Sequence, residues 1–158
     1  MSAATRATQA LKKAGANFTT HTYDYDPAAD RVGLQAAEAL GESPARVLKT
    51  LMARVDGKPA CVIVPSDCEV SMKKLAAVLG GKSAEMMKPT DAERLTGYKV
   101  GGISPFGQMR PAPVALEVSA LEHDLVYLNG GQRGLQVRLD PRDLATLLSA
   151  VVAPVVVA

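Results

Sequence analysis

The most constraining feature of this sequence is a pair of apolar runs that a turn dipeptide joins. Residues 47–55 form a β-rich run of nine residues, and residues 60–64 form a second run. Asp56-Gly57 lies between them, and this dipeptide favours the tight turn of a β-hairpin. We therefore expect an antiparallel pair of strands here.

Short strands and short helices alternate along the rest of the chain. Further strands are predicted at residues 18–25, 114–118, 125–128 and 135–139. Helices are predicted at residues 5–14, 35–40 and 71–79, after a capping box of Thr90 and Glu93, and after Asp140-Pro141, where Leu144, Leu147, Leu148 and Val151 share one face. Strands outnumber helices. This pattern predicts a mixed or antiparallel sheet, which could close into a barrel, with helices packed outside it.

Length and composition exclude several classes of protein. The 158 residues predict a single domain, 1–158, and 47% hydrophobic residues exclude a disordered chain. A net charge of +2 excludes a highly cationic, non-specific nucleic-acid binder, although a grip on a short piece of nucleic acid is compatible with it. The longest apolar run, residues 151–158, is far too short to cross a bilayer, so we expect a cytoplasmic protein.

Lys49 is the first candidate for a functional side chain. By strand alternation it shares a face with Val47 and Leu51, and a lysine on an apolar face needs a partner or a cleft. One interpretation is a cation aimed into a pocket, where it holds an anionic group or a developing oxyanion. The other is a lysine at the end of its strand that reaches water.

Two glycine-rich segments are the next candidates. Residues 101–107 pair two glycines with a proline, and the N–H groups of such a loop could bind a carbonyl oxygen or a phosphate. Residues 129–135 place three glycines around Arg133, which is typical of a flexible phosphate clamp. Each segment could instead be a simple turn between strands.

The remaining candidates are less specific. His21 and Tyr23 share a strand face, where they could line a pocket or decorate an exposed edge. Cys61 lies in an apolar strand and is expected in the core, and Cys68 lies in a loop. Two cysteines are too few for a disulfide framework or a structural zinc site, and no Ser-His-Asp arrangement is recognisable. We expect neither a metal nor a cofactor.

Four segments together resemble a known family. They are residues 21–24, 47–51, 96–108 and 130–135, in this order and at fitting separations. The chain is similar to the YbaK/EbsC family of bacterial Cys-tRNA(Pro) deacylases, relatives of the editing domain inserted in some prolyl-tRNA synthetases. The resemblance runs nearly end to end and implies the fold of that editing domain, an α/β (α+β) fold with a mixed, barrel-like sheet and surrounding helices.

The resemblance also implies a set of site residues. Lys49, Gly101 and Gly102 are expected to act in catalysis. The substrate-binding residues are expected to be Tyr23, Thr50, Ile103, Ser104, Pro105, Asn129, Arg133 and Gln136. Asn129 stands where the best-known members carry a serine, and Gln136 where they carry an aspartate, so a role that needs a carboxylate does not carry over.

The activity that the resemblance implies is removal of cysteine wrongly attached to tRNA(Pro). The cysteine thiol of the substrate would attack its own ester carbonyl and leave as a thiolactone, so the protein needs no nucleophile of its own. The expected partners are the acceptor end of an aminoacyl-tRNA and prolyl-tRNA synthetase. Two alternatives stay open: a deacylase that hydrolyses Ala-tRNA(Pro) with water, and a non-catalytic module that binds an aminoacyl end or docks on a synthetase.

Overall fold

The computed structural model describes residues 4–28 and 32–158. The helices are α1 (Arg6–Lys13), α2 (Val32–Leu40), α3 (Met72–Val78), α4 (Pro89–Thr96) and α5 (Pro141–Leu148), with short 3-10 helices at Pro44–Arg46 and Val118–Glu122. The strands are β1 (Thr19–Thr22), β2 (Leu48–Val55), β3 (Lys58–Pro65), β4 (Ala84–Met86), β5 (Val114–Glu117), β6 (Val126–Asn129), β7 (Leu135–Leu139) and β8 (Val151–Ala153).

The predicted hairpin is confirmed and forms the centre of the larger sheet. β2 and β3 pair antiparallel along their whole length, from Leu48 opposite Pro65 to Val55 opposite Lys58. Asp56-Gly57 makes the turn with both residues at positive φ, 50° and 81°. A two-residue hairpin turn of this kind needs positive φ at both positions, which is why this dipeptide favours it.

The strands form two sheets, and the predicted α+β class is confirmed. The larger sheet has the order β4-β2-β3-β5-β8, and the smaller has the order β1-β7-β6. β5 runs parallel to β3 and β8 runs parallel to β5, whereas the other pairs are antiparallel, so the larger sheet is mixed. The sheets do not close into a barrel: within the described chain a single parallel bridge, Val47 with Tyr127, joins them.

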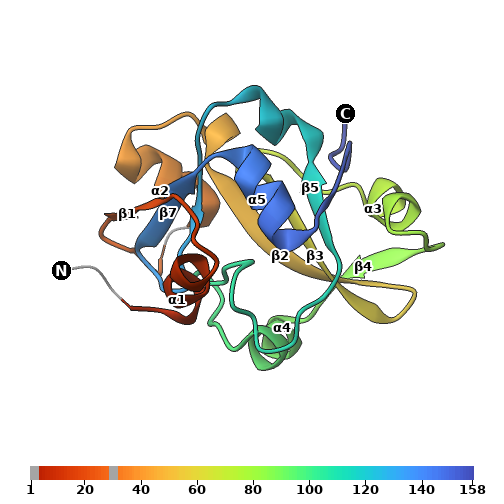
Figure 1. Cartoon of the computed structure of the whole chain (residues 1–158). Coiled ribbons are helices and arrows are strands. Elements are labelled where there is room, and N and C mark those ends of the chain that lie inside the picture. Colours follow the sequence, from red (N-terminus) through yellow and green to blue (C-terminus); the bar gives the residue numbers. More distant parts are fainter. Residues whose placement is uncertain (1–3, 29–31) are drawn as a thin grey trace.

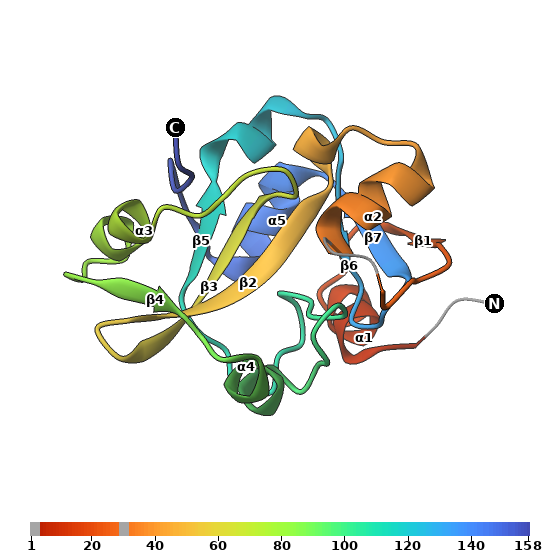
Figure 2. The same ribbon diagram turned by 180° about the vertical axis from the view of Figure 1, so that it is seen from behind.

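Helices cover both faces of the larger sheet. α5 lies across one face, over β2 and β3 (Figure 1), and its Leu144 belongs to the main core cluster. On the other face, Leu75 and Ala76 of α3 pack against alternate residues of β2 and β3. Viewed from behind, α1 lies beside β6, and α4 lies below β2 (Figure 2). The two faces of β2 therefore belong to two separate hydrophobic clusters.

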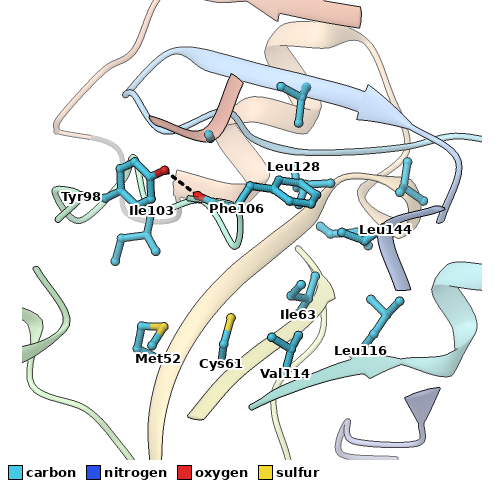
Figure 3. Packing of buried hydrophobic residues seen from close by; sticks show 14 of the residues in the cluster. Met52, Cys61, Ile63, Tyr98, Ile103, Phe106, Val114, Leu116, Leu128 and Leu144 are labelled. Carbon is cyan, nitrogen blue, oxygen red and sulfur yellow. Dashed lines mark hydrogen bonds between the residues drawn. The ribbon is translucent and has the colours of Figure 1, made fainter. Parts of the chain in front are cut away.

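The main core cluster holds the ordered loop between α4 and β5. Figure 3 shows Phe106 pointing toward Leu128 and Leu144, while the Tyr98 hydroxyl donates a hydrogen bond to the Phe106 carbonyl at 2.5 Å. Both aromatic residues are about 95% buried. The glycine-rich segment between them is thus fixed at both ends by core packing.

Three local predictions differ from the structure. α4 begins at Pro89 with Lys88 as its cap, so the capping box of Thr90 and Glu93 is wrong; proline fits the first helical position because it has no N–H to satisfy. α5 ends at Leu148, and Ser149 turns the chain at a φ of 49°, so Val151 lies in β8 and not on the helix. β1 is also shorter than predicted.

No helix in residues 4–28 and 32–158 is long and apolar enough to cross a membrane.

Candidate functional site

An interruption in the pairing of β2 creates the main cavity. β3 follows β2 throughout, but on the other edge β4 pairs only with residues 53–55, and the bridge to β6 lies at Val47. Between these points no strand of the described chain pairs with the outer edge of β2. A cavity of about 380 Å³ lies here, lined by every residue from Val47 to Met52. This volume is within the range of small-molecule sites.

The backbone of β2 also turns toward this cavity. The Met52 carbonyl accepts a hydrogen bond from the Met87 N–H at 3.1 Å, on the side away from β3. Backbone groups alternate along an antiparallel strand, so Thr50, two residues earlier, points its N–H and C=O to the same side. The cavity is thus bordered by main chain as well as by side chains.

Different elements supply the polar and the apolar parts of the lining. The end of β6 contributes Asn129, β7 contributes Gln136, and the segment after β1 contributes Tyr23. Residues around β4 and α4 supply an apolar wall: Met86, Met87, Pro89 and Ala92. Such a pocket, mostly apolar with a few placed polar groups, is typical of ligand-binding sites.

Three buried polar atoms in this cavity have no hydrogen-bond partner of acceptable geometry among the described residues. They are the Tyr23 hydroxyl, Thr50 Oγ1 and Gln136 Oε1. Leaving one such group buried and unsatisfied costs about 1–3 kcal/mol, so native structures keep few of them. Three in one cavity indicate a site that a polar ligand completes.

The Tyr23 phenol stays protonated at neutral pH. Burial raises its pKa and the nearby Tyr25 adds to the rise, while the Gly134 backbone and then the Gln136 amide oppose it through contacts that fall short of good hydrogen-bond geometry. The phenol can therefore donate as well as accept a hydrogen bond.

Lys49 belongs to the lining of the same cavity. It lies half-buried on β2, opposite Val64. Burial raises the pKa of the Cys68 thiol, Asp67 adds to the rise, and the Lys49 ammonium opposes it, so the ammonium lies near that loop. Lys49 and the glycine loop (residues 101–107) line the same cavity, and the orientation of the ammonium into it stays a prediction.

The glycine loop approaches the cavity through Gly101 and Ile103. Gly101 has a φ of +90°, and a Cβ atom there would lie 2.8 Å from the Tyr25 hydroxyl, so only glycine fits. Gly102 was expected to act beside it, but its N–H donates to the Lys99 carbonyl at 2.8 Å and it does not line the cavity. Its N–H is thus used within the loop.

Three further residues expected at the site lie outside the cavity lining: Ser104, Pro105 and Arg133. Ser104 is fully buried, and its Oγ accepts the Phe106 N–H at 3.2 Å, so it stabilises the turn of the loop. Pro105 is buried in the same turn. Arg133 lies exposed, with its Nε bound to the Val100 carbonyl.

Asn129 lines the cavity, but its amide is fully used by the backbone. Nδ2 donates to the carbonyls of Gly101 (3.1 Å) and Gln132 (3.3 Å). Oδ1 accepts the N–H groups of Gly131 (2.6 Å) and Gln132 (3.2 Å). A primary amide has two donors and two acceptor positions, so none remains for a hydrogen bond to substrate.

His21 does not line the cavity with Tyr23. Its Nε2 lies 2.8 Å from Thr19 Oγ1, and its ring meets the ring of Tyr127 edge-on at 5.3 Å. Cys61 is in the core as predicted, where burial raises the pKa of its thiol to about 12. In the described part of the chain, no cluster of three His, Cys, Asp or Glu residues could hold a metal ion.

No pattern in the sequence indicates the apolar wall. Met86 and Met87 reach the cavity only because β4 pairs with β2, about 30 residues earlier in the chain. The complete lining has one further property: none of the described residues that form it is Asp, Glu, His or Cys. Lys49 and Tyr23 are its titratable side chains.

Comparison with known proteins assigns this architecture. The profile of the family described as "Aminoacyl-tRNA editing domain" matches residues 26–147. The chain belongs to this family. The YbaK/EbsC resemblance of the sequence is confirmed by "Putative Cys-tRNA(Pro)/Cys-tRNA(Cys) deacylase EbsC" of Enterococcus faecalis, which is 34% identical over 128 residues, 79% of this chain and 77% of that protein.

Other relatives and solved structures agree with this assignment. The chain is 34% identical over 104 residues to a proline–tRNA ligase of Maridesulfovibrio salexigens, of which the match covers 17%. A structure described as "a putative trans-editing enzyme for prolyl tRNA synthetase" superposes with a TM-score of 0.85, at 25% identity, over 99% of this chain and all of that one. This aminoacyl-tRNA editing domain thus shares its fold with a free-standing protein and part of its sequence with synthetases.

Proposed function

We propose that this editing domain acts in trans as a deacylase that removes cysteine from mischarged tRNA(Pro), with the substrate thiol as nucleophile. The observation that carries the proposal is the chemistry of the cavity. It offers a cation and orphaned polar atoms, but its described lining holds no carboxylate, imidazole or thiol. The family and the name of the Enterococcus relative supply the substrate class.

The described lining offers no general base, and this favours cysteine over alanine as the substrate. Attack by water on an ester needs a group that accepts the water proton near neutral pH. The Tyr23 phenol is unsuited to this because its pKa is raised. A cysteinyl ester brings its own nucleophile, since a few per cent of a free thiol is thiolate at pH 7 and thiolate is strongly nucleophilic.

The proposed step balances without a co-reactant. The cysteine sulfur forms a bond to the ester carbonyl carbon, and the bond from that carbon to the ribose oxygen breaks. The thiol proton ends on the ribose oxygen. The products are uncharged tRNA and a four-membered thiolactone, which water opens to cysteine.

Two groups of this chain can assist that step. The Lys49 ammonium favours the thiolate and the developing oxyanion by charge. The Gly101 N–H can donate to the carbonyl oxygen as negative charge develops on it, and one such donor is worth about 10²–10³-fold in rate. The orphaned oxygens of Tyr23, Thr50 and Gln136 suit the α-ammonium group of the aminoacyl ester, which carries three donors.

The size of the cavity limits which part of the proposed substrate enters it. A cavity of about 380 Å³ takes an esterified amino acid and its terminal nucleoside, and not a tRNA body. We propose that the acceptor end enters the cavity and that prolyl-tRNA synthetase supplies the choice of tRNA.

The test is deacylation of Cys-tRNA(Pro), compared with the same tRNA charged with alanine, serine or 2-aminobutyrate. The 2-aminobutyryl ester has a methyl group in place of the thiol at nearly the same size. We expect cleavage of the cysteinyl ester alone and recovery of the thiolactone. Equal rates on the 2-aminobutyryl ester would show hydrolysis by water, and binding without cleavage would show a non-catalytic module.

Lys49→Ala tests the cation, with Lys58→Ala as its matched control. Lys58 is exposed at the start of β3 and does not belong to the cavity lining. We expect Lys49→Ala to lower kcat at least 100-fold and Lys58→Ala to leave it unchanged. Equal activity of the two variants would exclude a role for the Lys49 charge.

A further inference from the structure

Arg133 holds the outer side of the glycine loop. Its Nε donates a hydrogen bond to the Val100 carbonyl at 2.9 Å, and its guanidinium lies over the Tyr25 ring, 5.3 Å from the ring centre. Arg133 is absent from the cavity lining, whereas Val100 and Gly101 belong to it. The arginine therefore reaches the loop from outside the pocket.

The Val100 carbonyl and the Gly101 N–H belong to one peptide unit. In a planar trans peptide these two groups point in opposite directions. Because Arg133 fixes the carbonyl on the outer side, it also directs the Gly101 N–H away from itself, toward the cavity side. A positive φ at Gly101 makes this orientation compatible with the turn that follows.

The next peptide unit is held at both of its ends. Asn129 Nδ2 donates to the Gly101 carbonyl at 3.1 Å, and the Gly102 N–H donates to the Lys99 carbonyl at 2.8 Å. Asn129 and Arg133 lie on either side of the turn that contains Gly130 and Gly131. Their side chains bind two consecutive carbonyls of the glycine loop, those of Gly101 and Val100. With that second unit fixed, Arg133 controls the remaining freedom of the first.

We propose that Arg133 is a positioning residue, which grips the Val100 carbonyl and thereby aims the Gly101 N–H at the ester carbonyl oxygen of the substrate. The proposal rests on the function proposed above. It differs from the phosphate clamp that the glycine-rich sequence around Arg133 suggests, because it assigns the arginine to the protein's own backbone.

Chemistry distinguishes the two roles. An arginine that binds a phosphate group can be replaced in part by lysine, because lysine keeps the positive charge. A lysine ammonium lacks the planar fork that bonds a carbonyl while stacking on an aromatic ring, so it does not replace a positioning arginine. Misplacing a reacting group by about 1 Å costs about 10²-fold in rate.

The kinetic test compares Arg133→Ala and Arg133→Lys, with Arg110→Ala as control for charge. Arg110 is exposed and outside the cavity lining. We expect both Arg133 variants to lower kcat on Cys-tRNA(Pro) by about 10–100-fold, with KM within about threefold and its salt dependence unchanged. Two results together would overturn positioning in favour of a phosphate contact. They are a nearly normal kcat of Arg133→Lys, and in Arg133→Ala a plot of log KM against log salt concentration whose slope is smaller by about 0.7–0.9.

A second measurement separates this proposal from the proposed function. In the substrate-free protein, the Gly101 amide signal in a ¹⁵N–¹H NMR spectrum should shift or broaden in both Arg133 variants and stay fixed in Arg110→Ala, while the Gly57 signal stays fixed in all three. An unmoved Gly101 signal would refute positioning. If the wild-type protein cleaves no cysteinyl ester, the proposed function fails, and the NMR result still decides whether Arg133 sets the orientation of the loop.

Discussion

Replacing Thr50 by valine should make the protein more stable and less active. The Thr50 hydroxyl is buried in the cavity wall with no hydrogen-bond partner of acceptable geometry among the described residues. A buried unsatisfied polar group costs about 1–3 kcal/mol, and valine has the same shape without the polar atom. Taking the low end, because solvent can reach part of the cavity, we expect the free energy of unfolding to rise by about 1 kcal/mol.

Thr96 provides the matched control for this substitution. It is fully buried, its Oγ1 donates to the Ala92 carbonyl at 2.7 Å, and the same atom accepts the Tyr98 N–H at 3.1 Å. Thr96→Val removes both bonds and leaves the Tyr98 N–H buried, so it should lower the free energy of unfolding by about 1–3 kcal/mol. The two substitutions are chemically identical and should have effects of opposite sign.

Urea unfolding at pH 7 and thermal unfolding measure both effects. About 1 kcal/mol corresponds to a rise in Tm of roughly 2–4 °C for a domain of this size. Deacylation by Thr50→Val should fall in parallel, because a polar group of the substrate loses its partner. The reasoning is refuted if Thr50→Val destabilises the protein as much as Thr96→Val, since the hydroxyl would then be satisfied in the substrate-free state.

Two further predictions concern ionisable groups outside the cavity. Burial of the Glu117 carboxyl works against ionisation, but hydrogen bonds from Ser119 and the Val155 N–H outweigh it and lower its pKa. The ionised Glu117 carboxylate should thus stabilise the protein above the pKa that this group has in the unfolded chain, and the effect should be lost as pH falls through its lower pKa in the folded protein. In urea unfolding, Glu117→Gln should lower the free energy of unfolding by about 1.5–3 kcal/mol at pH 7 and by progressively less in acid. A cost that does not change with pH would contradict this account. The Cys61 thiol, with its pKa raised to about 12, should react with a disulfide reagent only after unfolding, whereas the part-exposed Cys68 should react in the native protein. If both thiols react rapidly with the reagent in the native protein, the burial of Cys61 is contradicted.

Local sequence signals predicted those parts of the fold that local chemistry decides. The hairpin of β2 and β3 was predicted because Asp56-Gly57 can adopt positive φ. The end of α5 was missed because Ser149 adopts a left-handed conformation that serine rarely takes. The start of α4 was misplaced because Pro89 takes the first helical position. Each of these differences depends on one residue, and the propensity of that residue alone does not determine its conformation.

The site could be predicted only in part, for a different reason. Lys49 and Gly101 stand out in the sequence, as a charge in an apolar strand and a glycine beside a second glycine. Ser104 has the same polar character but uses its hydroxyl inside its own turn. Whether a polar side chain faces a ligand or the backbone depends on which partners folding brings to it, and the composition of a segment does not contain that information.

The pocket exists because the outer edge of β2 has no paired strand between Val47, which bridges to β6, and residue 53, where pairing with β4 begins. Apart from proline, no substitution removes a backbone N–H group, so a part of a ligand that meets this border meets the same main-chain groups in almost every variant of the chain. Preference among ligands then depends on the side chains contributed by surrounding segments, such as Met86 and Gln136. With such a division, substitutions in the lining would change which ligand is preferred, while the main-chain border stays the same.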